Sequence, residues 1–267
     1  MRTLPSYAFP LSIAVGVMVA ISAALGLFLE ATYASEATSF ATQGRAQDLV
    51  TLFWVVPVFG AALYYERKGM FVARVAWLGV LLYFTYTYLM ASVGLAYNFL
   101  FLLYVTIYGT SLALLVVGLC CIRSEDIGWR FSYRFQRRGT AIFSIAIGIL
   151  IALLWLADII RSLASGTPPP QLSEAVTQSL VVQAMDLGII MPLSVIGGLL
   201  LWRSVPIGYV LSGIIIVKAL TLGPAMVAMA AFQSAGGMQV PAPLWAFALL
   251  VTGAGAYFGY RYIKSLV

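Results

Sequence analysis

The chain contains no histidine and only two cysteines. The missing histidine excludes His-ligated haem and zinc sites, Ser-His dyads and histidine-dependent lipid phosphatases. Cys120 and Cys121 are adjacent at the end of an apolar run, so they cannot form a CxxC redox pair and are expected to be small apolar fillers. A GxxxxGK(S/T) phosphate loop and paired mid-membrane acids are missing too. We therefore expect no enzymatic activity, no metal and no cofactor.

Charged residues are also scarce. They make up 9% of the 267 residues, against 62% hydrophobic residues, and the mean hydropathy is +0.99. A soluble domain carries about a quarter charged residues. The apolar runs instead approach the roughly 20 residues that an α-helix needs to cross a bilayer. The composition predicts an all-α polytopic membrane protein embedded in a lipid bilayer.

Eight apolar runs are predicted to cross the membrane. The expected spans are residues 10–29, 48–65, 75–95, 99–121, 141–162, 180–202, 207–232 and 244–262. With a cytoplasmic N-terminus, all but three of the fifteen Lys and Arg residues lie in cytoplasmic segments. These are Arg2, Arg67, Lys68, Arg74, Arg123, Arg130, Arg134, Arg137, Arg138, Arg203, Arg261 and Lys264.

This distribution obeys the positive-inside rule and predicts that both termini are cytoplasmic. The exceptions are Arg45 and Arg161, which fall outside, and Lys218, which lies in a span. Membrane topology therefore accounts for the net charge of +6, and we expect no nucleic-acid partner.

A segment in the second half of the chain has a weaker copy in the first half. Residues 185–203 are MDLGIIMPLSVIGGLLLWR, and residues 47–67 are QDLVTLFWVVPVFGAALYYER. The copies align at an offset of 138 residues. Aligned pairs include Asp48 with Asp186 and Gly60 with Gly198. Each copy also contains a proline, Pro57 or Pro192, but these two are three positions out of register.

The similarity predicts two related four-helix halves, residues 1–138 and 139–267. Each half contains an even number of spans, so both enter the membrane in the same orientation. The internal repeat is therefore expected to be a parallel tandem repeat, unlike the inverted repeats of many transporters.

Two ionisable side chains lie inside predicted spans, where an unpaired charge is costly. Asp186 is expected about one turn below the outer boundary of span six, and Lys218 about 16 Å into span seven at ~1.5 Å per residue. Because spans six and seven form a tight hairpin, we predict that Asp186 and Lys218 form an ion pair. The pair marks either a ligand site or a structural contact that fixes how the two helices pack.

Three more carboxylates are expected at the outer ends of helices, at Glu30, Asp48 and Asp158. Arg45 precedes Asp48 by three residues, a spacing at which helical side chains pair. Arg161 follows Asp158 at the same spacing. These acids are either interface charges at span ends or, with Asp48, part of an outer binding site.

Tyrosine is concentrated in spans three and four. Tyr83, Tyr104 and Tyr108 lie deeper than the usual aromatic belt, so their hydroxyls need partners inside the bundle. Asn98 lies in the turn between these spans. The side chains line either a cavity with scattered polar groups or a network of interhelical hydrogen bonds. The candidate ligand-binding residues are Asp48, Tyr83, Asn98, Tyr104, Tyr108, Asp186 and Lys218.

Several short motifs carry a resemblance to a known family. They are residues 47–52 (QDLVTL), 97–105 (YNFLFLLYV), 154–156 (LWL), 166–170 (GTPPP), Asp186-Leu187, 200–203 (LLWR), Pro206 and Gly208-Tyr209. With these motifs the chain resembles a family of uncharacterised bacterial eight-helix integral membrane proteins. The resemblance implies an architecture, a bacterial origin and a place in the inner membrane, but no activity. Members usually have proline where this chain has Phe99, so the turn there is expected to differ.

Two functions remain open from the sequence. One is the binding or transport of a small hydrophobic or amphipathic, lipid-like molecule between the helices near the outer leaflet. Prolines inside the spans and a buried charge favour this function. The other is a non-catalytic accessory subunit that joins partner subunits in a larger membrane complex. The short loops and the missing catalytic groups favour that alternative.

Overall fold

The computed structural model describes residues 3–127, 130–132, 135–169, 172 and 179–266. Arg2, Arg134 and Pro170, which belong to predicted cytoplasmic segments and to the proline-rich loop, lie outside these residues. Within the described ranges the chain is helical, with one isolated β-bridge between Phe131 and Leu266 and no strand. Eight helices are long and apolar enough to cross a membrane, as the composition predicted.

Most spans are single helices, and two are interrupted. The elements are α1 (Ala8–Phe28), η1 (Glu30–Tyr33), α2 (Thr38–Val50), η2 (Thr51–Val55), α3 (Val56–Glu66), α4 (Phe71–Gly94), α5 (Phe101–Cys120), α6 (Arg137–Ser165), α8 (Val181–Met185), η5 (Asp186–Ile190), α9 (Met191–Trp202), α10 (Pro206–Ala235) and α11 (Ala242–Lys264). The second span consists of α2, η2 and α3, and the sixth of α8, η5 and α9.

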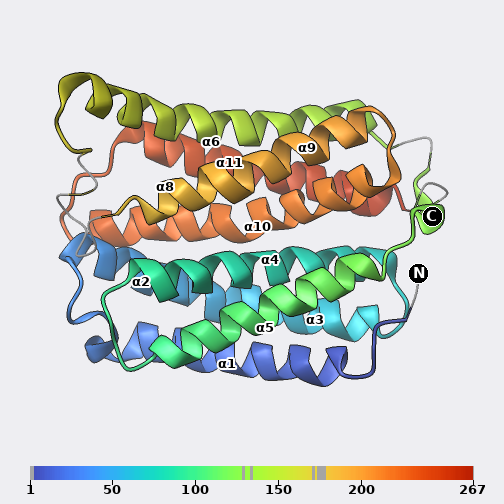
Figure 1. Cartoon of the computed structure of the whole chain (residues 1–267), viewed down its shortest axis with the longest axis horizontal. Coiled ribbons are helices and arrows are strands. Elements are labelled where there is room, and N and C mark those ends of the chain that lie inside the picture. The colour runs from blue at the N-terminus through green and yellow to red at the C-terminus, as the bar shows by residue number, and fades with distance from the viewer. Residues whose placement is uncertain (1–2, 128–129, 133–134, 170–171, 173–178, 267) are drawn as a thin grey trace.

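The helices form two layers (Figure 1). One layer contains α1–α5, called the first half from here on, and the other contains α6–α11, the second half. α4 and α10 pack against each other between the layers, and α10 also packs against α2. Both termini lie at the same end of the bundle, as an even number of spans requires.

The second span begins at Thr38, although the apolar run predicted a start at residue 48. Residues 38–47 are mostly polar or small, so a search for apolar residues ends at Asp48. The helix nevertheless continues through them, and the extension packs against η1 and α10. This difference matters because the extension forms one wall of the candidate site.

The two interrupted spans share a local geometry. The N–H of Val56 donates to the carbonyl of Thr51, and the N–H of Met191 donates to the carbonyl of Asp186, so each span contains one π-helical turn. A proline follows directly in both spans. The wider turn accommodates a residue that lacks an N–H and whose ring crowds the preceding carbonyls.

These turns and prolines are separated by 135 residues, three fewer than the offset that aligned the two aspartates. In this register Asp186 corresponds to Thr51 and not to Asp48. Gly60 and Gly198 also differ, because a Cβ on Gly60 would meet nothing within 4 Å while one on Gly198 would press against the backbone of α6. The division into two repeated halves stays a prediction, with 135 as its better register.

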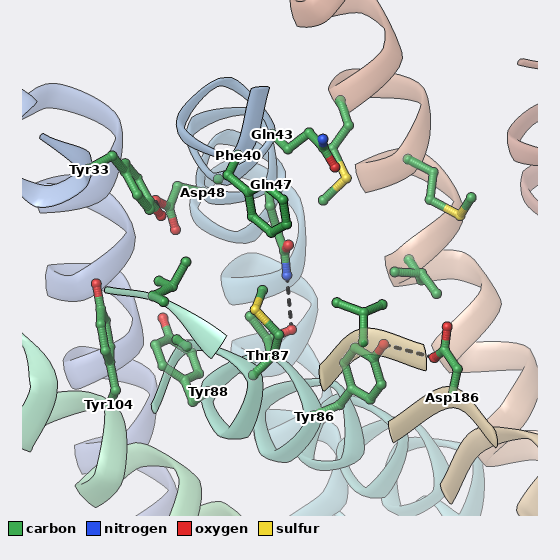
Figure 2. Close-up of a pocket in the computed structure, with 18 of the residues that line it drawn as sticks. Tyr33, Phe40, Gln43, Gln47, Asp48, Tyr86, Thr87, Tyr88, Tyr104 and Asp186 are labelled. Carbon is green, nitrogen blue, oxygen red and sulfur yellow. Dashed lines mark hydrogen bonds between the residues drawn. The ribbon is translucent and has the colours of Figure 1, made fainter. Parts of the chain in front are cut away.

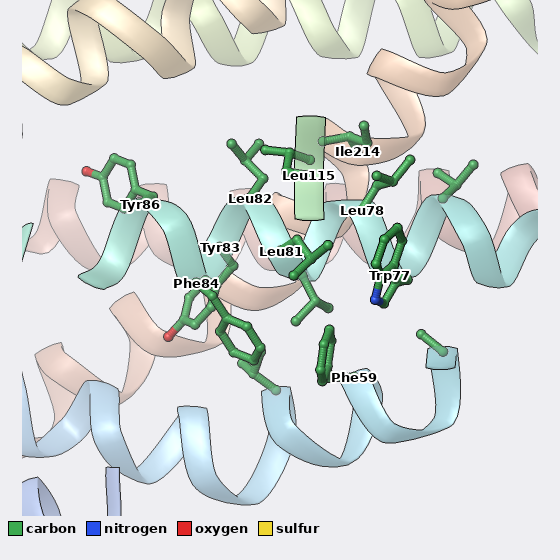
Figure 3. Close-up of a cluster of buried hydrophobic side chains, with 14 of the residues drawn as sticks. Phe59, Trp77, Leu78, Leu81, Leu82, Tyr83, Phe84, Tyr86, Leu115 and Ile214 are labelled. Atoms are coloured by element: carbon green, nitrogen blue, oxygen red, sulfur yellow. The ribbon is translucent and has the colours of Figure 1, made fainter. Parts of the chain in front are cut away.

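The apolar core is centred on α4, most of which is buried. Trp77, Tyr83 and Phe84 are fully buried, and the ring of Phe84 packs edge-on against Phe59 of α3 at 5.0 Å between centroids (Figure 3). α4 is apolar or aromatic on all sides, which is the pattern of a helix surrounded by others. Side chains of α4 therefore contact helices of both halves.

Candidate ligand-binding site

A cavity of about 310 Å³ lies between the two halves, at the end of the bundle opposite the termini. We call it the inter-half cavity (Figure 2). Its polar and aromatic lining residues are Ser22, Tyr33, Phe40, Gln43, Gln47, Asp48, Tyr86, Thr87, Tyr88, Tyr104, Trp155, Asp186 and Gln233. Methionine and leucine side chains of α10 complete the wall. Both halves therefore contribute to one site.

Asp48 enters the cavity from α2 and is held by Tyr33, the last residue of η1. The Tyr33 hydroxyl donates a hydrogen bond of 2.6 Å to Asp48 Oδ2. Two glycines make this contact sterically feasible. A Cβ on Gly26 would collide with the Asp48 carboxylate, and one on Gly44 would lie 2.7 Å from the Tyr33 ring.

Tyr33 is a permanent donor in this pair. Burial, followed by the charge of Asp48 and the hydrogen bond to it, raises the pKa of Tyr33 well above its usual value. The phenol therefore stays protonated at any physiological pH. Asp48 gains one fixed donor, and no Lys or Arg of the described chain lies within 4.0 Å of its carboxylate.

Asp186 reaches the same cavity from the opposite half. It is buried, with 8% of its surface exposed, and it begins the π-helical turn η5. One carboxylate oxygen accepts a hydrogen bond of 2.8 Å from Tyr86 of α4 (Figure 2). The other accepts one of 2.8 Å from Trp155 Nε1 of α6. The three helices are thus joined at one buried carboxylate, which satisfies the rule that such groups need hydrogen-bond partners.

Lys218 does not form the predicted ion pair with Asp186. No carboxylate of the described residues lies within 4.0 Å of its Nζ, and no described group accepts a hydrogen bond from it. The Nζ lies 3.7 Å from the centroid of the Tyr86 ring. Tyr86 contacts both charged groups, with its hydroxyl donating to Asp186 and its ring face on the ammonium, which is a cation–π contact.

A second cavity of about 60 Å³ lies next to the inter-half cavity, and Asp186, Trp155 and Met226 line both. Lys218 and Ser194 line it, and the hydroxyl of Ser194 has no hydrogen-bond partner among the described residues. The volume is sufficient for water molecules. The lysine is thus placed beside the inter-half cavity rather than in its wall.

Of the two predicted local pairs, one is present. Arg161 and Asp158 lie 3.4 Å apart on the exposed end of α6, as predicted. The Arg45–Asp48 pair is wrong, because Asp48 turns toward Tyr33 and no described acid lies within 4.0 Å of Arg45. The hydrogen bond from the Tyr33 hydroxyl therefore orients the Asp48 carboxylate away from Arg45.

The predicted tyrosines and Asn98 separate into different roles. Tyr104 lines the cavity, with its ring 5.9 Å from that of Tyr88. Tyr83 lies behind the wall, where its hydroxyl is 2.7 Å from that of Thr51. The other two lie away from the cavity. Tyr108 packs against the core, and Asn98 donates to the carbonyl of Thr32 and accepts from the N–H of Leu100.

Several lining residues were not anticipated from the sequence. Tyr33 and Phe40 precede the predicted second span, whereas Trp155 lies in predicted span five and Tyr86 in the tyrosine-rich span three. The available signal was the polar tip of each aromatic side chain, since a buried phenol or indole N–H requires a partner. Which partner it finds depends on helix rotation, which periodicity does not give.

The chain matches no family model, no curated protein and no solved structure. The resemblance to bacterial eight-helix proteins, with the bacterial origin that it implies, therefore stays a prediction. No cluster of three or more His, Cys, Asp or Glu side chains able to hold a metal occurs in the described part of the chain. Any function has to be argued from the inter-half cavity itself.

Proposed function

We propose that the protein binds a small amphipathic or lipid-like molecule in the inter-half cavity and carries it within the bilayer. The cavity is the observation on which this rests. Its volume of about 310 Å³ falls at the lower end of the range of small-molecule sites. A mainly apolar wall with a few oriented polar groups is the usual composition of such sites.

The polar groups are fixed before any ligand arrives. Tyr33 holds Asp48, and Tyr86 with Trp155 holds Asp186. Gln47 donates a 3.1 Å hydrogen bond to Thr87 on α4. Preorganised groups of this kind reduce the ordering cost of binding, which supports a binding role over mere packing.

The interrupted spans support movement of the ligand as well as its binding. The π-helical turns η2 and η5 lie beside the site, and each is followed by a proline. π-helical turns inside α-helices are frequent at functional sites. A π-helical turn beside a proline is also a point at which a helix bends, so the two parts of a span can shift relative to each other there.

The proposal places the protein in the cytoplasmic membrane of a bacterium, with both termini cytoplasmic and the cavity near the outer leaflet. The distribution of basic residues supports the orientation. Loops that carry Arg67, Lys68 and Arg123 lie at the same end of the bundle as the termini. The proposal involves no catalytic step, no cofactor and no nucleic acid.

A cavity-filling substitution tests this function. Ala91 lines the cavity, and Ala91→Trp would occupy part of its volume. Ala113→Trp is the control, because Ala113 is exposed on the outer face of α5. The measurement is native mass spectrometry of protein extracted from membranes into nanodiscs, which reports co-purifying small molecules.

We expect a bound molecule in the wild type and in Ala91→Trp a loss of at least about tenfold in occupancy, since each 1.4 kcal/mol of lost affinity is a factor of ten. Ala113→Trp should retain the molecule. Equal retention by both variants, or no adduct in any of the three proteins, would count against the proposal.

The accessory-subunit alternative predicts a continuous outward face of small residues. Within the helices, the glycines with open space around them are Gly60, Gly109, Gly188 and Gly253. They lie on α3, α5, η5 and α11, so each is on a different element. This scatter gives the alternative less support than the cavity gives to ligand binding.

A further inference from the structure

We propose that the inter-half cavity selects a monovalent organic cation, whose ammonium-type group binds at Asp48 while its apolar body packs on the surrounding rings. This inference rests on the proposed function and names the chemical class of its ligand. It comes from three features of the cavity, namely its charge, its aromatic walls and its lack of metal-type ligands.

The first feature is a carboxyl group without a cationic partner. Asp48 and Asp186 line the cavity, and none of the described lining residues is Lys or Arg. Asp186 has two hydrogen-bond donors, and one of them, Tyr86, also contacts Lys218 through its ring face. Asp48 has one neutral donor, the Tyr33 hydroxyl.

A carboxylate far from water is costly unless a cation or a proton neutralises it. For Asp186 the neutralising charge is Lys218, which lines the small cavity together with it. For Asp48 the protein supplies no cation within 4.0 Å among the described residues. The missing charge is assigned to the ligand.

The second feature is the arrangement of rings beside Asp48. Tyr88 and Tyr104 lie near Asp48 with their rings 5.9 Å apart, and Phe40 also lines the cavity (Figure 2). Aromatic faces attract ammonium groups through their quadrupoles, most strongly when water is excluded. A carboxylate beside tyrosine rings is the composition of sites that hold amines and quaternary ammonium ions.

The third feature argues against a divalent metal ion as the cation. Ca²⁺ takes six to eight oxygen ligands at about 2.3–2.6 Å, and Mg²⁺ requires near-octahedral oxygen coordination. In the described part of the chain Asp48 belongs to no group of three or more His, Cys, Asp or Glu side chains that could hold such an ion. One carboxylate with ring neighbours suits a single positive charge spread over an organic group.

The test measures which charge the cavity admits, and it does not require the natural ligand. A cysteine is introduced by Ala91→Cys in a protein that carries Cys120→Ser and Cys121→Ser. Three methanethiosulfonate reagents are compared, a trimethylammonium cation, a sulfonate anion and a neutral methyl reagent. Ser35→Cys, at an exposed position at the same end of the bundle, supplies the reference rates.

We expect the cation-to-anion ratio of modification rates at Ala91→Cys to exceed the reference ratio by on the order of tenfold, because a unit charge acts strongly in a cavity of low dielectric constant. Adding Asp48→Asn should return the ratio to the reference. Adding Asp158→Asn, which removes a carboxylate on the exposed end of α6, should leave it unchanged.

The neutral reagent distinguishes the remaining outcomes. An unchanged neutral rate in the Asp48→Asn protein shows that the cavity is intact and that only its charge has changed. A ratio at or below the reference, or one that Asp48→Asn does not lower, overturns the assignment of an organic cation and leaves the proposed function standing. If the neutral reagent fails to modify Ala91→Cys at all, the cavity is closed to solutes and both proposals fail.

Discussion

Positions separated by 135 residues hold a neutral pair in the first half and two charged groups in the second. In the first half, Thr51 begins the π-helical turn η2, and its hydroxyl lies 2.7 Å from that of Tyr83 on α4. At positions 135 residues later, Asp186 begins η5 and Lys218 lies on α10. Both spans contain a π-helical turn followed by a proline, but the side chains at these positions differ in charge.

A side chain from the other half contacts both charged groups. Tyr86 of α4 donates its hydroxyl to Asp186, and its ring centroid lies 3.7 Å from Lys218 Nζ. Its counterpart at the same offset is Thr221, whose hydroxyl bonds to carbonyls of its own helix. At this position only the first half contributes a side chain to the other half. The functional groups are therefore to be sought among the residues that differ between the two halves.

A topology experiment tests whether the two halves have the same orientation in the membrane, and it has the largest expected effect. If the halves are parallel repeats, Ser35 and Ser179 should face outside while Ser124 and Lys264 face the cytoplasm. Single cysteines at these four exposed positions, in a background without Cys120 and Cys121, should react with an impermeant maleimide in an all-or-none pattern. Labelling of Ser35→Cys and Ser179→Cys from opposite sides would show that the halves are inverted.

The charged pair should give the next largest effect. Asp186→Asn leaves the buried Lys218 uncompensated, which is expected to lower the free energy of unfolding by about 3 kcal/mol. Lys218→Met should also destabilise, and the double variant should cost less than either single change because no charge is then left alone. The measurement is reversible unfolding in mixed micelles.

The first half supplies the matched control. Thr51→Val removes only a hydroxyl pair and should cost about 1 kcal/mol, the usual net value of one hydrogen bond. A double variant of Asp186 and Lys218 no more stable than the worse single would show that the two charges do not interact across Tyr86. Lys218 would then require a different neutralising partner.

The sequence was sufficient for the eight spans, because crossing a bilayer requires long runs without charge and these are visible residue by residue. It also identified Asp48, Asp186 and Tyr104 as candidates, since polar groups inside spans are costly. It did not find the start of the second span at Thr38, because polar helical residues leave no apolar signature.

The contacts of the site lay beyond the sequence for a geometric reason. Tyr33 meets Asp48 across a loop, and Trp155 meets Asp186 from another helix. Such contacts depend on how far each helix is rotated and shifted against its neighbours, whereas apolar periodicity fixes only the buried side. The prediction of a direct Asp186–Lys218 pair failed for the same reason, since donors from α4 and α6 bind the two carboxylate oxygens of Asp186.

Another contact between the halves depends on Pro224 in α10, and its removal should have the smallest effect on stability. Pro224 lacks an N–H, so the carbonyl of Leu220 loses its partner within α10. Trp54 of the first half donates a 3.0 Å hydrogen bond from its Nε1 to that carbonyl. Within a bilayer, where water does not replace missing partners, this bond is expected to contribute about 1 kcal/mol.

A double-mutant cycle isolates this contribution. Trp54→Phe should cost about 1 kcal/mol in the wild type and close to nothing in Pro224→Ala, because the restored N–H then bonds to Leu220 along the helix. Trp202→Phe is the control, since Trp202 is 46% exposed against 48% for Trp54 and ends its helix at the opposite end of the bundle. Equal costs of Trp54→Phe in both backgrounds would mean that the indole stabilises by packing alone. A coupling of the expected size would show that Trp54 of the first half supplies the hydrogen bond that the Leu220 carbonyl lacks within α10.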